Sequence, residues 1–317
     1  MNDAPTRVVV AAGPTASGKS ALALALAERF GGVVINADSM QVYRELAVLT
    51  ARPRADAFAR APHCLYGIVP ASEACSAGRW RELARDEIAA ARGTGRVPIV
   101  AGGTGLYLRA LMAGLARIPP VPDSVRRRVR VRIAREGAPA LHAELAARDP
   151  ASAARLVPND AQRIARALEV LEATGRGLAD WQLAGQGADA NGLAFFVILV
   201  APARAQLHRA IEHRFVRMVA DGALAEVRAL AALGLDPGLP AMKAVGVREL
   251  SRHLGGEATL AEACAEAVAA TRRYAKRQVT WFRHQLVPDL VIEALLPPVP
   301  EDPVFPAVAR FLAGAPA

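Results

Sequence analysis

The chain has 317 residues, of which 53% are hydrophobic and 22% are charged. This length and balance predict a globular protein of one large or two modest domains and exclude an intrinsically disordered chain. The longest strongly apolar run, residues 194–203, is about half of the roughly 20 residues that span a bilayer, so no transmembrane helix is expected. The three cysteines form neither a paired framework nor a CxxC metal motif, which favours a reducing cytoplasm.

The net charge of +9 favours association with polyanions. Three of the 39 basic residues are lysines, at positions 19, 243 and 276, and the other 36 are arginines. A lysine retained at position 19 of such an arginine-rich chain indicates that a compact charge on a flexible stem is required there.

The first third of the chain alternates strands with helices. Residues 7–12 (RVVVAA) predict a buried strand, and residues 19–30 predict a helix that begins inside the loop GPTASGKS. A second strand (31–39) ends on a polar cluster, a helix follows at 79–95, and another strand, glycine turn and helix begin at residue 97. This alternation predicts an α/β fold with a parallel sheet, helices on both faces, and ligands at the carboxyl ends of the strands.

The pattern changes near residue 115. A proline-rich boundary, IPPVPD, precedes sequence that is helical from 123 to about 174 and carries no strand pattern. Residues 195–201 (FFVILVA) predict another buried strand, followed by helices to about 285 and an irregular tail. We therefore expect an α/β core formed by residues 1–115 and 196–317, interrupted by a helical insertion domain at 116–195.

The loop GPTASGKS matches the phosphate-binding pattern GxxxxGK[ST] in the required context, between a strand and a helix. Its glycines let backbone N–H groups turn toward an anion, and the helix N-terminus adds a favourable dipole. Lys19 would reach phosphate oxygens, and the Ser20 hydroxyl is available to Mg²⁺. The motif does not identify the substrate, because P-loop hydrolases and kinases usually hold magnesium with an acidic residue that ends a second strand. One candidate strand ends in glycines and Thr104, and the other ends in Asp38, which is either the metal's carboxylate or has another task.

The segment AGGTGLY (101–107) is a second glycine-rich turn between a strand and a helix. By itself it is a weak motif, and a tight turn or a helix start explains it equally well. Its place at the end of a predicted core strand puts Thr104 in the same crevice as the phosphate loop.

A later helix aims an arginine at the protein interior. Leu207, Ile211, Phe215 and Met218 share one helical face, and Arg214 lies inside that apolar stripe. A buried arginine requires an anionic partner, which is either an internal Asp or Glu or a phosphate of the ligand.

Three segments of the chain favour a nucleic-acid partner. DSVRRRVRVRIAREG places six arginines on about three helical turns, with no acidic residue before Glu136 to pair with them. PNDAQRIARALEVLEATG begins with an N-cap-like Asn-Asp and has an apolar stripe that includes Ile164 and Leu168. TRRYAKRQVTWFRH combines basic residues with aromatic ones, which suits RNA, although Trp281 and Phe282 serve equally well as core residues.

Taken together, these residues resemble the tRNA dimethylallyltransferases (tRNA isopentenyltransferases). The shared blocks, in order to about residue 285, are GPTASGKS, NADSMQVYRELAVLTARP, HCLYGIVP, SAGRWRE, PIVAGGTGLYLRAL, PNDAQRIARALEV, IEHRFVRM, AMKAVGVREL and ATRRYAKRQVTWFR. The resemblance implies a P-loop NTPase-like α/β fold. It also implies transfer of a dimethylallyl group from dimethylallyl diphosphate to the N6 amine of the adenine immediately 3′ of a tRNA anticodon. Three positions depart from the family, with Glu45 and Leu49 where it has glycine and Arg52 where it has lysine.

The resemblance further implies a role for each matching residue. The catalytic residues would be Asp38, as general base or hydrogen-bond acceptor for the amine, with Thr104 and Arg214. Ser20 would hold Mg²⁺, and Lys19 and Arg214 would stabilise the departing diphosphate. The residues implied to bind that diphosphate are Gly13, Pro14, Thr15, Ala16, Ser17, Gly18, Lys19 and Ser20. The residues implied to contact tRNA are Asp38, Ser39, Met40, Gln41, Thr104, Arg126, Gln162, Arg163, Ile164, Ala165, Arg166, Lys243, Ala244, Val245, Gly246, Val247 and Arg248.

Two other functions explain part of the sequence. A P-loop kinase or NTPase for a small molecule would account for GPTASGKS but not for the arginine-rich insertion. A non-catalytic RNA-binding protein would leave Asp38 and the interior Arg214 without a task. We therefore expect a cytoplasmic, monomeric transferase with no membrane partner, which uses Mg²⁺, dimethylallyl diphosphate and the anticodon stem-loop of tRNA.

Overall fold

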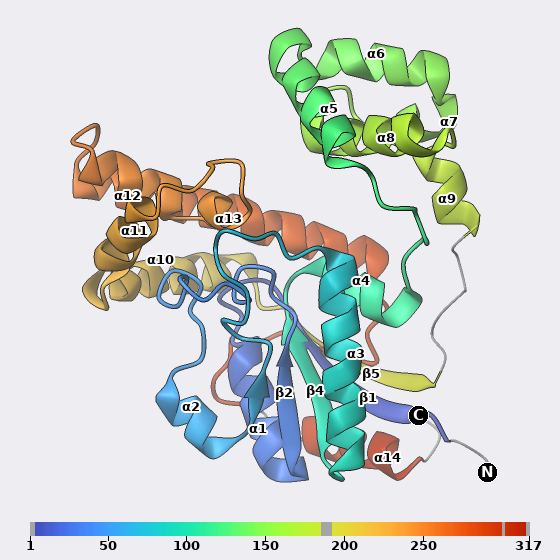
Figure 1. Cartoon of the computed structure of the whole chain (residues 1–317). Helices are drawn as coiled ribbons and strands as arrows, with labels where there is room; N and C mark the ends of the chain where they lie inside the picture. The colour runs from blue at the N-terminus through green and yellow to red at the C-terminus, as the bar shows by residue number, and fades with distance from the viewer. Residues whose placement is uncertain (1–3, 185–191, 300–301, 315–317) are drawn as a thin grey trace. The chain divides into compact units, whose positions relative to one another are not determined.

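The computed structural model of the chain describes residues 4–184, 192–299 and 302–314. It divides into two compact units, the first formed by Met1–Met112 with Asn191–Ala317 and the second by Ala113–Ala190 (Figure 1). The sequence-based boundaries lie a few residues further along the chain, and the second of them falls inside the strand β5 (Leu193–Val200). Among the described residues, no helix combines the length and the apolarity needed to cross a membrane.

The first unit is built on a six-stranded parallel sheet of order β3-β2-β4-β1-β5-β6. The register pairs Ala12 with Gly102 and Asn36 with Ala101, so β1, β2 and β4 end at one edge of the sheet. The sequence predicted four of the six strands and missed β3 and β6, which have two and three residues. Besides β5, the strands are β1 (Thr6–Ala12), β2 (Gly32–Asn36), β3 (His63–Cys64), β4 (Val97–Gly102) and β6 (Leu290–Ile292).

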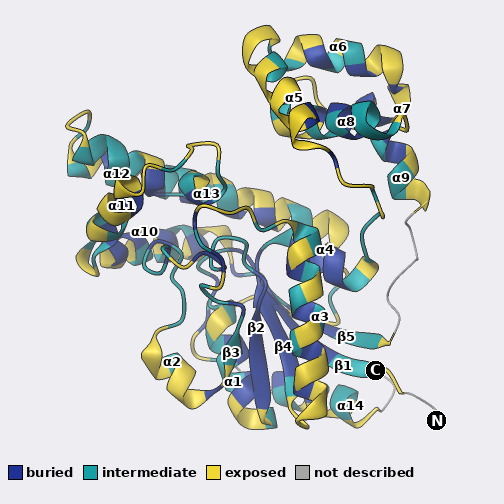
Figure 2. Ribbon diagram, viewed as in Figure 1, coloured by how far each residue is buried: buried dark blue, intermediate teal, exposed yellow. Residues whose placement is uncertain are grey.

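Helices cover both faces of the sheet, as predicted for an α/β fold. Val9 and Ala11 of β1 pack with α1 (Lys19–Phe30), while Val8 and Val10 pack with α3 (Ala77–Gly93) and α4 (Gly105–Ala113). Alternate residues of one strand therefore belong to two separate cores, and Figure 2 shows β2 and β4 as buried. The other helices of this unit are α2 (Ala55–Arg60), α10 (Arg204–Ala220), α11 (Ala223–Ala232), the short 3₁₀ helix η1 (Ala241–Lys243), α12 (Val247–Leu254), α13 (Leu260–Gln285) and α14 (Val304–Ala313).

The tail of the chain contains a helix, so the prediction that it is irregular was wrong for α14. Pro306 lies in the first turn of α14, where the missing N–H removes no intrahelical hydrogen bond. Val304 and Val308 are fully buried in the same apolar cluster as Val9. Burial of this apolar face stabilises a helix that the proline-rich sequence obscured.

Up to residue 184, the last described residue of the second unit, five helices pack around a core of their own: α5 (Asp123–Glu136), α6 (Ala138–Arg148), α7 (Pro150–Ala153), α8 (Ala161–Thr174) and α9 (Leu178–Ala184). Val129, Leu141 and Leu168 are fully buried in that core. The predicted N-cap is confirmed, because the Asp160 carboxylate accepts the backbone N–H of Arg163 at 3.1 Å. Figure 2 shows much of α5 as exposed.

The arginine run of α5 is partly neutralised inside this unit. The expectation that the run lacks acidic partners was wrong, because Glu144 and Glu172 reach it from α6 and α8. Within the described residues, Arg127 and Arg130 are exposed and have no ion pair. The ion pairs are Arg126–Asp123 (3.7 Å), Arg128–Glu172 (2.6 Å), Arg132–Glu136 (3.0 Å), Arg132–Glu144 (2.5 Å), Arg132–Glu172 (3.9 Å) and Arg135–Glu136 (2.6 Å).

The end of β4 leaves no room for a side chain, and we expect Gly102→Ala to destabilise the protein. A Cβ atom at Gly102 would lie 2.2 Å from the carbonyl oxygen of Ala37, which would force β2 and β4 apart. Overpacking of this kind costs about 1–3 kcal/mol, and the midpoint of urea unfolding measures it. The control is Gly93→Ala at the end of α3, where a Cβ atom meets nothing within 4 Å. Equal midpoints for the two variants would contradict the prediction.

Candidate active site

The phosphate loop GPTASGKS connects β1 to α1 and begins the helix at Lys19, as predicted. Gly18 has a φ of +89°, and a Cβ atom there would lie 2.1 Å from the carbonyl oxygen of Leu296. The backbone N–H of Leu296 donates a hydrogen bond to the Ser17 carbonyl at 3.1 Å. The segment that follows β6 therefore holds one side of the loop, and a glycine is required at position 18.

Lys19 is a cation that lacks a full set of acceptors. Its Nζ donates to the carbonyl oxygen of Pro14 at 3.3 Å, and no carboxylate of the described residues lies within 4 Å of it. Burial lowers the pKa of Lys19 to about 8, the negative charge of Asp38 raises it in part, and the positive charge of Arg214 lowers it further. An anion placed beside Lys19 would therefore stabilise its charged form.

Arg214 lies where the sequence predicted, on the inward face of α10. Leu207, Ile211, Phe215 and Met218 of that face are buried, and the guanidinium of Arg214 donates to the hydroxyl of Thr15 in the phosphate loop. An internal ion pair was the alternative, but no carboxylate of the described residues lies within 4 Å of Arg214. Burial lowers the pKa of Arg214 to about 10, while the charge of Asp38 acts in the opposite direction.

Asp38 follows the end of β2, and its backbone is fixed by Asn36, which the sequence analysis missed. The side-chain oxygen of Asn36 accepts the N–H of Asp38 at 2.8 Å, and its amide group donates to the carbonyls of Asp38 and Leu65 at 3.0 Å. Asp38 Oδ1 accepts the N–H of Met40 at 2.9 Å, whereas Oδ2 has no hydrogen bond within the described residues. The sequence feature that could have identified Asn36 is its position: it is a polar residue at the end of a buried strand, two residues before Asp38.

Thr104 lies beside the Asp38 loop, as predicted. Its hydroxyl oxygen accepts the N–H of Ser39 at 2.9 Å and lies 3.3 Å from the hydroxyl of Ser39. Burial and the charge of Asp38 raise the pKa of Tyr274, and a hydrogen bond with Thr104 opposes that rise. The amide of Gln41 donates to the carbonyl of Thr50 at 2.8 Å, so this side chain braces its own loop.

Of the three positions that depart from the family, Leu49 is buried, and Glu45 and Arg52 have hydrogen-bond partners. The Glu45 carboxylate accepts the N–H of Ala71 at 2.8 Å, and the guanidinium of Arg52 donates to the carbonyl of Tyr43 at 3.4 Å. The same loop is anchored from α11, where the carboxylate of Glu226 accepts three consecutive backbone N–H groups, at residues 47–49, at 2.7–2.9 Å. These contacts fix the loop that carries Asp38.

The residues predicted to contact tRNA fall into exposed and buried groups. In the first unit Lys243 and Arg248 are exposed and Val245 is half-buried; in the second unit Arg126, Gln162 and Arg163 are exposed, and Ala165 and Arg166 are half-buried. The residues that present little or no surface are Ile164, Ala244, Gly246 and Val247. These four leave little side-chain surface for a direct contact with tRNA, and their predicted role stays a prediction.

The donor atoms near the phosphate loop suit a magnesium ion that arrives with a ligand. Among the described residues, no group of three or more His, Cys, Asp or Glu side chains could hold a metal. The available oxygens belong to the exposed Ser20 and to Asp38. Mg²⁺ usually keeps several waters and binds through one or two protein ligands together with substrate phosphates, so this donor set fits it.

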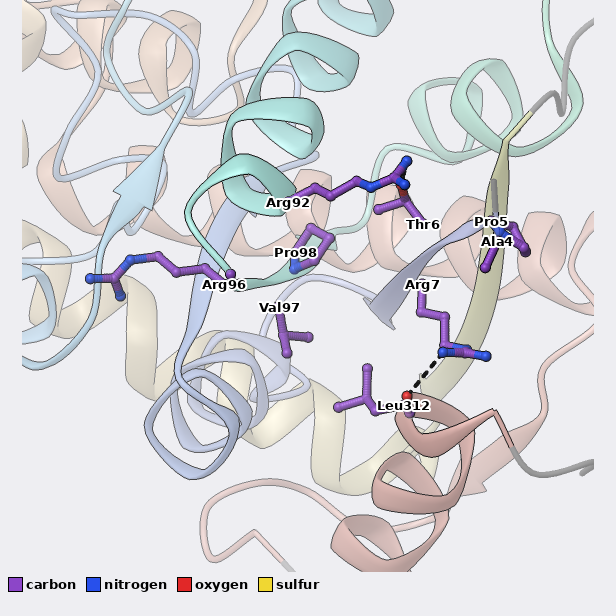
Figure 3. A pocket seen from close by; sticks show the side chains of 10 residues that line it. Ala4, Pro5, Thr6, Arg7, Arg92, Arg96, Val97, Pro98 and Leu312 are labelled. Carbon is purple, nitrogen blue, oxygen red and sulfur yellow. Dashed lines mark hydrogen bonds between the residues drawn. The ribbon is translucent and has the colours of Figure 1, made fainter. Parts of the chain in front are cut away.

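A surface pocket of about 240 Å³ lies at the opposite edge of the sheet (Figure 3). It is lined by the amino ends of β1 and β4, at Thr6 and Val97, and by Arg7, Arg92 and Arg96. The guanidinium of Arg7 donates to the carbonyl of Leu312 at 3.1 Å. No predicted site residue lines this pocket, so it has no part in the site at the carboxyl edge.

Comparisons with known proteins agree on one family. A sequence model described as IPP transferase matches residues 41–285, and one described as isopentenyl transferase matches residues 6–63. The tRNA dimethylallyltransferase of Rhodospirillum centenum is 61% identical over 279 residues, which cover 88% of this chain and 89% of that protein. The enzyme of the same name from Rhodospirillum rubrum is 55% identical over 289 residues, covering 91% of this chain and 89% of that protein.

Solved structures give the same result. The tRNA isopentenylpyrophosphate transferase of Bacillus halodurans is 32% identical with a TM-score of 0.66, and the match covers 98% of this chain and 96% of that one. A eukaryotic dimethylallyltransferase acting on tRNA is 25% identical with a TM-score of 0.81, and the match covers 98% of this chain and 80% of that one.

The three lysines allow the charge state of Lys19 to be measured directly. In the NMR spectrum of protein with ¹³C-labelled lysines, we expect one signal to titrate near pH 8 rather than near the usual value of about 10.4. Lys19→Arg identifies it by its loss. Asp38→Asn should lower this pKa further, because the charge of Asp38 stabilises the ammonium, and Arg214→Met should raise it. A titration at the ordinary value, or one that Asp38→Asn leaves unchanged, would overturn the electrostatic description.

Proposed function

This chain belongs to the family of tRNA dimethylallyltransferases, and we propose that it transfers the dimethylallyl group of dimethylallyl diphosphate to the N6 amine of the adenine immediately 3′ of the anticodon. One observation supports the proposal most directly. The negative charge of Asp38 raises the pKa values of both Lys19 and Arg214, although its carboxylate forms no ion pair with either side chain. Lys19 and Arg214 would stabilise an anion that leaves. The free carboxylate oxygen of Asp38 would accept a proton that is removed.

The phosphate loop would bind the diphosphate of the donor. Its backbone N–H groups and the N-terminus of α1 favour an anion there. Lys19 donates to the neutral carbonyl of Pro14, and the diphosphate would supply the negative charge that this carbonyl lacks. Arg214, held at Thr15, would present its planar group to a second phosphate oxygen. These contacts strengthen as the C–O bond breaks and negative charge collects on the leaving diphosphate.

The Ser20 hydroxyl and the diphosphate oxygens would hold a magnesium ion, which supplies positive charge to the leaving group when bound. The protein's own contribution at this point is the exposed position of Ser20 in the first turn of α1, directly after Lys19. Ordinary metal-ligand clusters are not needed for this arrangement, since the diphosphate itself provides most of the ligands.

Asp38 would act on the acceptor. As the N6–carbon bond forms and the carbon–oxygen bond of the donor breaks, the proton of the amine passes to Asp38 Oδ2, and the diphosphate departs. Asn36 fixes the backbone of Asp38, and the N–H of Met40 holds its carboxylate in place during this step. Thr104 and Ser39, which are bonded to each other, offer hydroxyls beside the adenine.

Exposed basic residues, together with the exposed amide of Gln162, would contact the anticodon arm of the tRNA. The positions proposed are Lys243 and Arg248 in the first unit and Arg126, Gln162 and Arg163 in the second. Contacts to phosphates give affinity without reading the sequence, and they offset the energy needed to move the adenine out of its stack. We propose that the protein acts in the cytoplasm as a monomer.

The donor is tested by incubating purified protein and Mg²⁺ with undermodified tRNA and either dimethylallyl diphosphate or ATP. We expect the tRNA to gain the mass of one dimethylallyl group less a hydrogen with the first donor only. A tRNA with guanine in place of the target adenine is the control and should gain nothing. Release of phosphate from ATP, with tRNA left unmodified by dimethylallyl diphosphate, would overturn the proposal in favour of a P-loop NTPase.

The role of Asp38 is tested by Asp38→Asn, which keeps an oxygen for the N–H of Met40 but cannot take a proton at neutral pH. We expect kcat to fall by about 10²- to 10⁴-fold while tRNA affinity changes little, measured by single-turnover kinetics and filter binding. The matched control is Asp236→Asn, because exposed Asp236 accepts the N–H of Gly238 in the same i to i+2 pattern. A parallel loss of tRNA binding would assign Asp38 a structural role instead.

A further inference from the structure

We propose that Gln278 is a positioning residue that holds the phosphate loop and the glycine turn around Thr104 at a fixed separation. This inference rests on the proposed function, because it concerns how donor and acceptor are aligned for transfer. Gln278 lies on α13 and is buried, with 6% of its surface exposed.

The side-chain amide of Gln278 links the two turns directly. Its Oε1 accepts the backbone N–H of Thr15 at 2.8 Å, and its Nε2 donates to the backbone carbonyl of Gly103 at 2.8 Å. Thr15 follows β1 and Gly103 follows β4, and these strands are neighbours in the sheet. A glutamine amide has one oxygen to accept and one nitrogen to donate, so the donor N–H and the acceptor carbonyl define its orientation.

The glycine turn is shaped to receive this side chain. A Cβ atom at Gly103 would lie 2.4 Å from Gln278 Nε2, and one at Gly105 would lie 2.3 Å from the ring of Trp281. Gln278 and Trp281 are three residues apart, so one face of α13 contacts both Gly103 and Gly105.

Thr15 is held from two sides. Its N–H is bonded to Gln278 of α13, and its hydroxyl accepts from Arg214 of α10. The N–H of Thr15 is therefore used by the protein, and the loop is braced before any ligand enters. Because one displaced ångström between reacting groups can reduce a rate about 100-fold, a fixed span from Thr15 to Gly103 matters for transfer more than for binding.

Two variants of Gln278 separate this role from general stability. Gln278→Glu keeps an acceptor for Thr15 N–H but cannot donate to Gly103 when ionised, so the Thr104 turn is released while the phosphate loop stays braced. Gln278→Met removes both hydrogen bonds at similar side-chain length. The matched control is Gln285→Met, which makes the same change at an exposed position of the same helix.

The experiment measures single-turnover transfer to tRNA, binding of inorganic pyrophosphate and binding of tRNA. For Gln278→Glu we expect the transfer rate to fall about 10- to 100-fold, with both affinities within about threefold of the unsubstituted protein. Gln278→Met should lose the same rate and also bind pyrophosphate several-fold more weakly. Gln285→Met should match the unsubstituted protein.

Each outcome decides one question. Unchanged transfer in Gln278→Glu, or a rate that falls only in proportion to pyrophosphate or tRNA binding, would overturn the positioning role. If the unsubstituted protein itself fails to modify tRNA, the proposed function is wrong. In that case the loss of pyrophosphate binding in Gln278→Met still tests the contact with Thr15.

Discussion

The candidate site depends on the parallel pairing of three strands. β4 pairs with β1 through Gly102 and Ala12, and with β2 through Ala101 and Asn36. Neighbouring strands lie about 4.8 Å apart, so the three turns that follow them converge at one edge over roughly 10 Å. The phosphate loop, Asp38 and Thr104 are brought together by backbone hydrogen bonds, and side-chain contacts such as Ser39 to Thr104 only adjust their positions.

Lys19 and Arg214 bring two positive charges to this edge of the sheet, opposed by the single negative charge of Asp38. Burial lowers the pKa of Lys19 and of Arg214, and the single carboxylate of Asp38 opposes this only in part. Two cations kept near each other and partly removed from water reduce the stability of the folded chain. Binding of a diphosphate would reverse that loss, because it supplies the negative charge that both side chains lack. Under the proposed function, the site would therefore lose some folding stability in exchange for anion affinity, which is common where function requires buried charge.

Local patterns in the sequence predicted much of the fold and the first contacts of the site. GPTASGKS between a strand and a helix, the stripe from Leu207 to Met218, and the N-cap at Asp160 each depend on residues within one or two turns of each other. The pairs that the sequence did not predict join residues far apart in the chain. Glu172 pairs with Arg128 of α5, and Glu226 anchors residues 47–49. Nothing in a charge run or a lone glutamate reveals which distant group will meet it, so these contacts required the structure.

The two glycine-rich turns show how a local pattern can be right while its cause lies elsewhere. In a phosphate loop, glycine is expected where the backbone approaches the anion. Here the space at Gly18 is taken by the carbonyl of Leu296, and the space at Gly103 and Gly105 is taken by Gln278 and Trp281. These glycines are therefore required by close approach of other parts of the protein, whatever ligand is bound. The glycines of GGTG are a weak phosphate-binding motif. They are better explained by the close packing of α13 against this turn. Gln278 of α13 then forms hydrogen bonds with both Gly103 and the phosphate loop. The glycine turn at residues 103–105 is therefore linked to the phosphate loop through α13 as well as through the sheet.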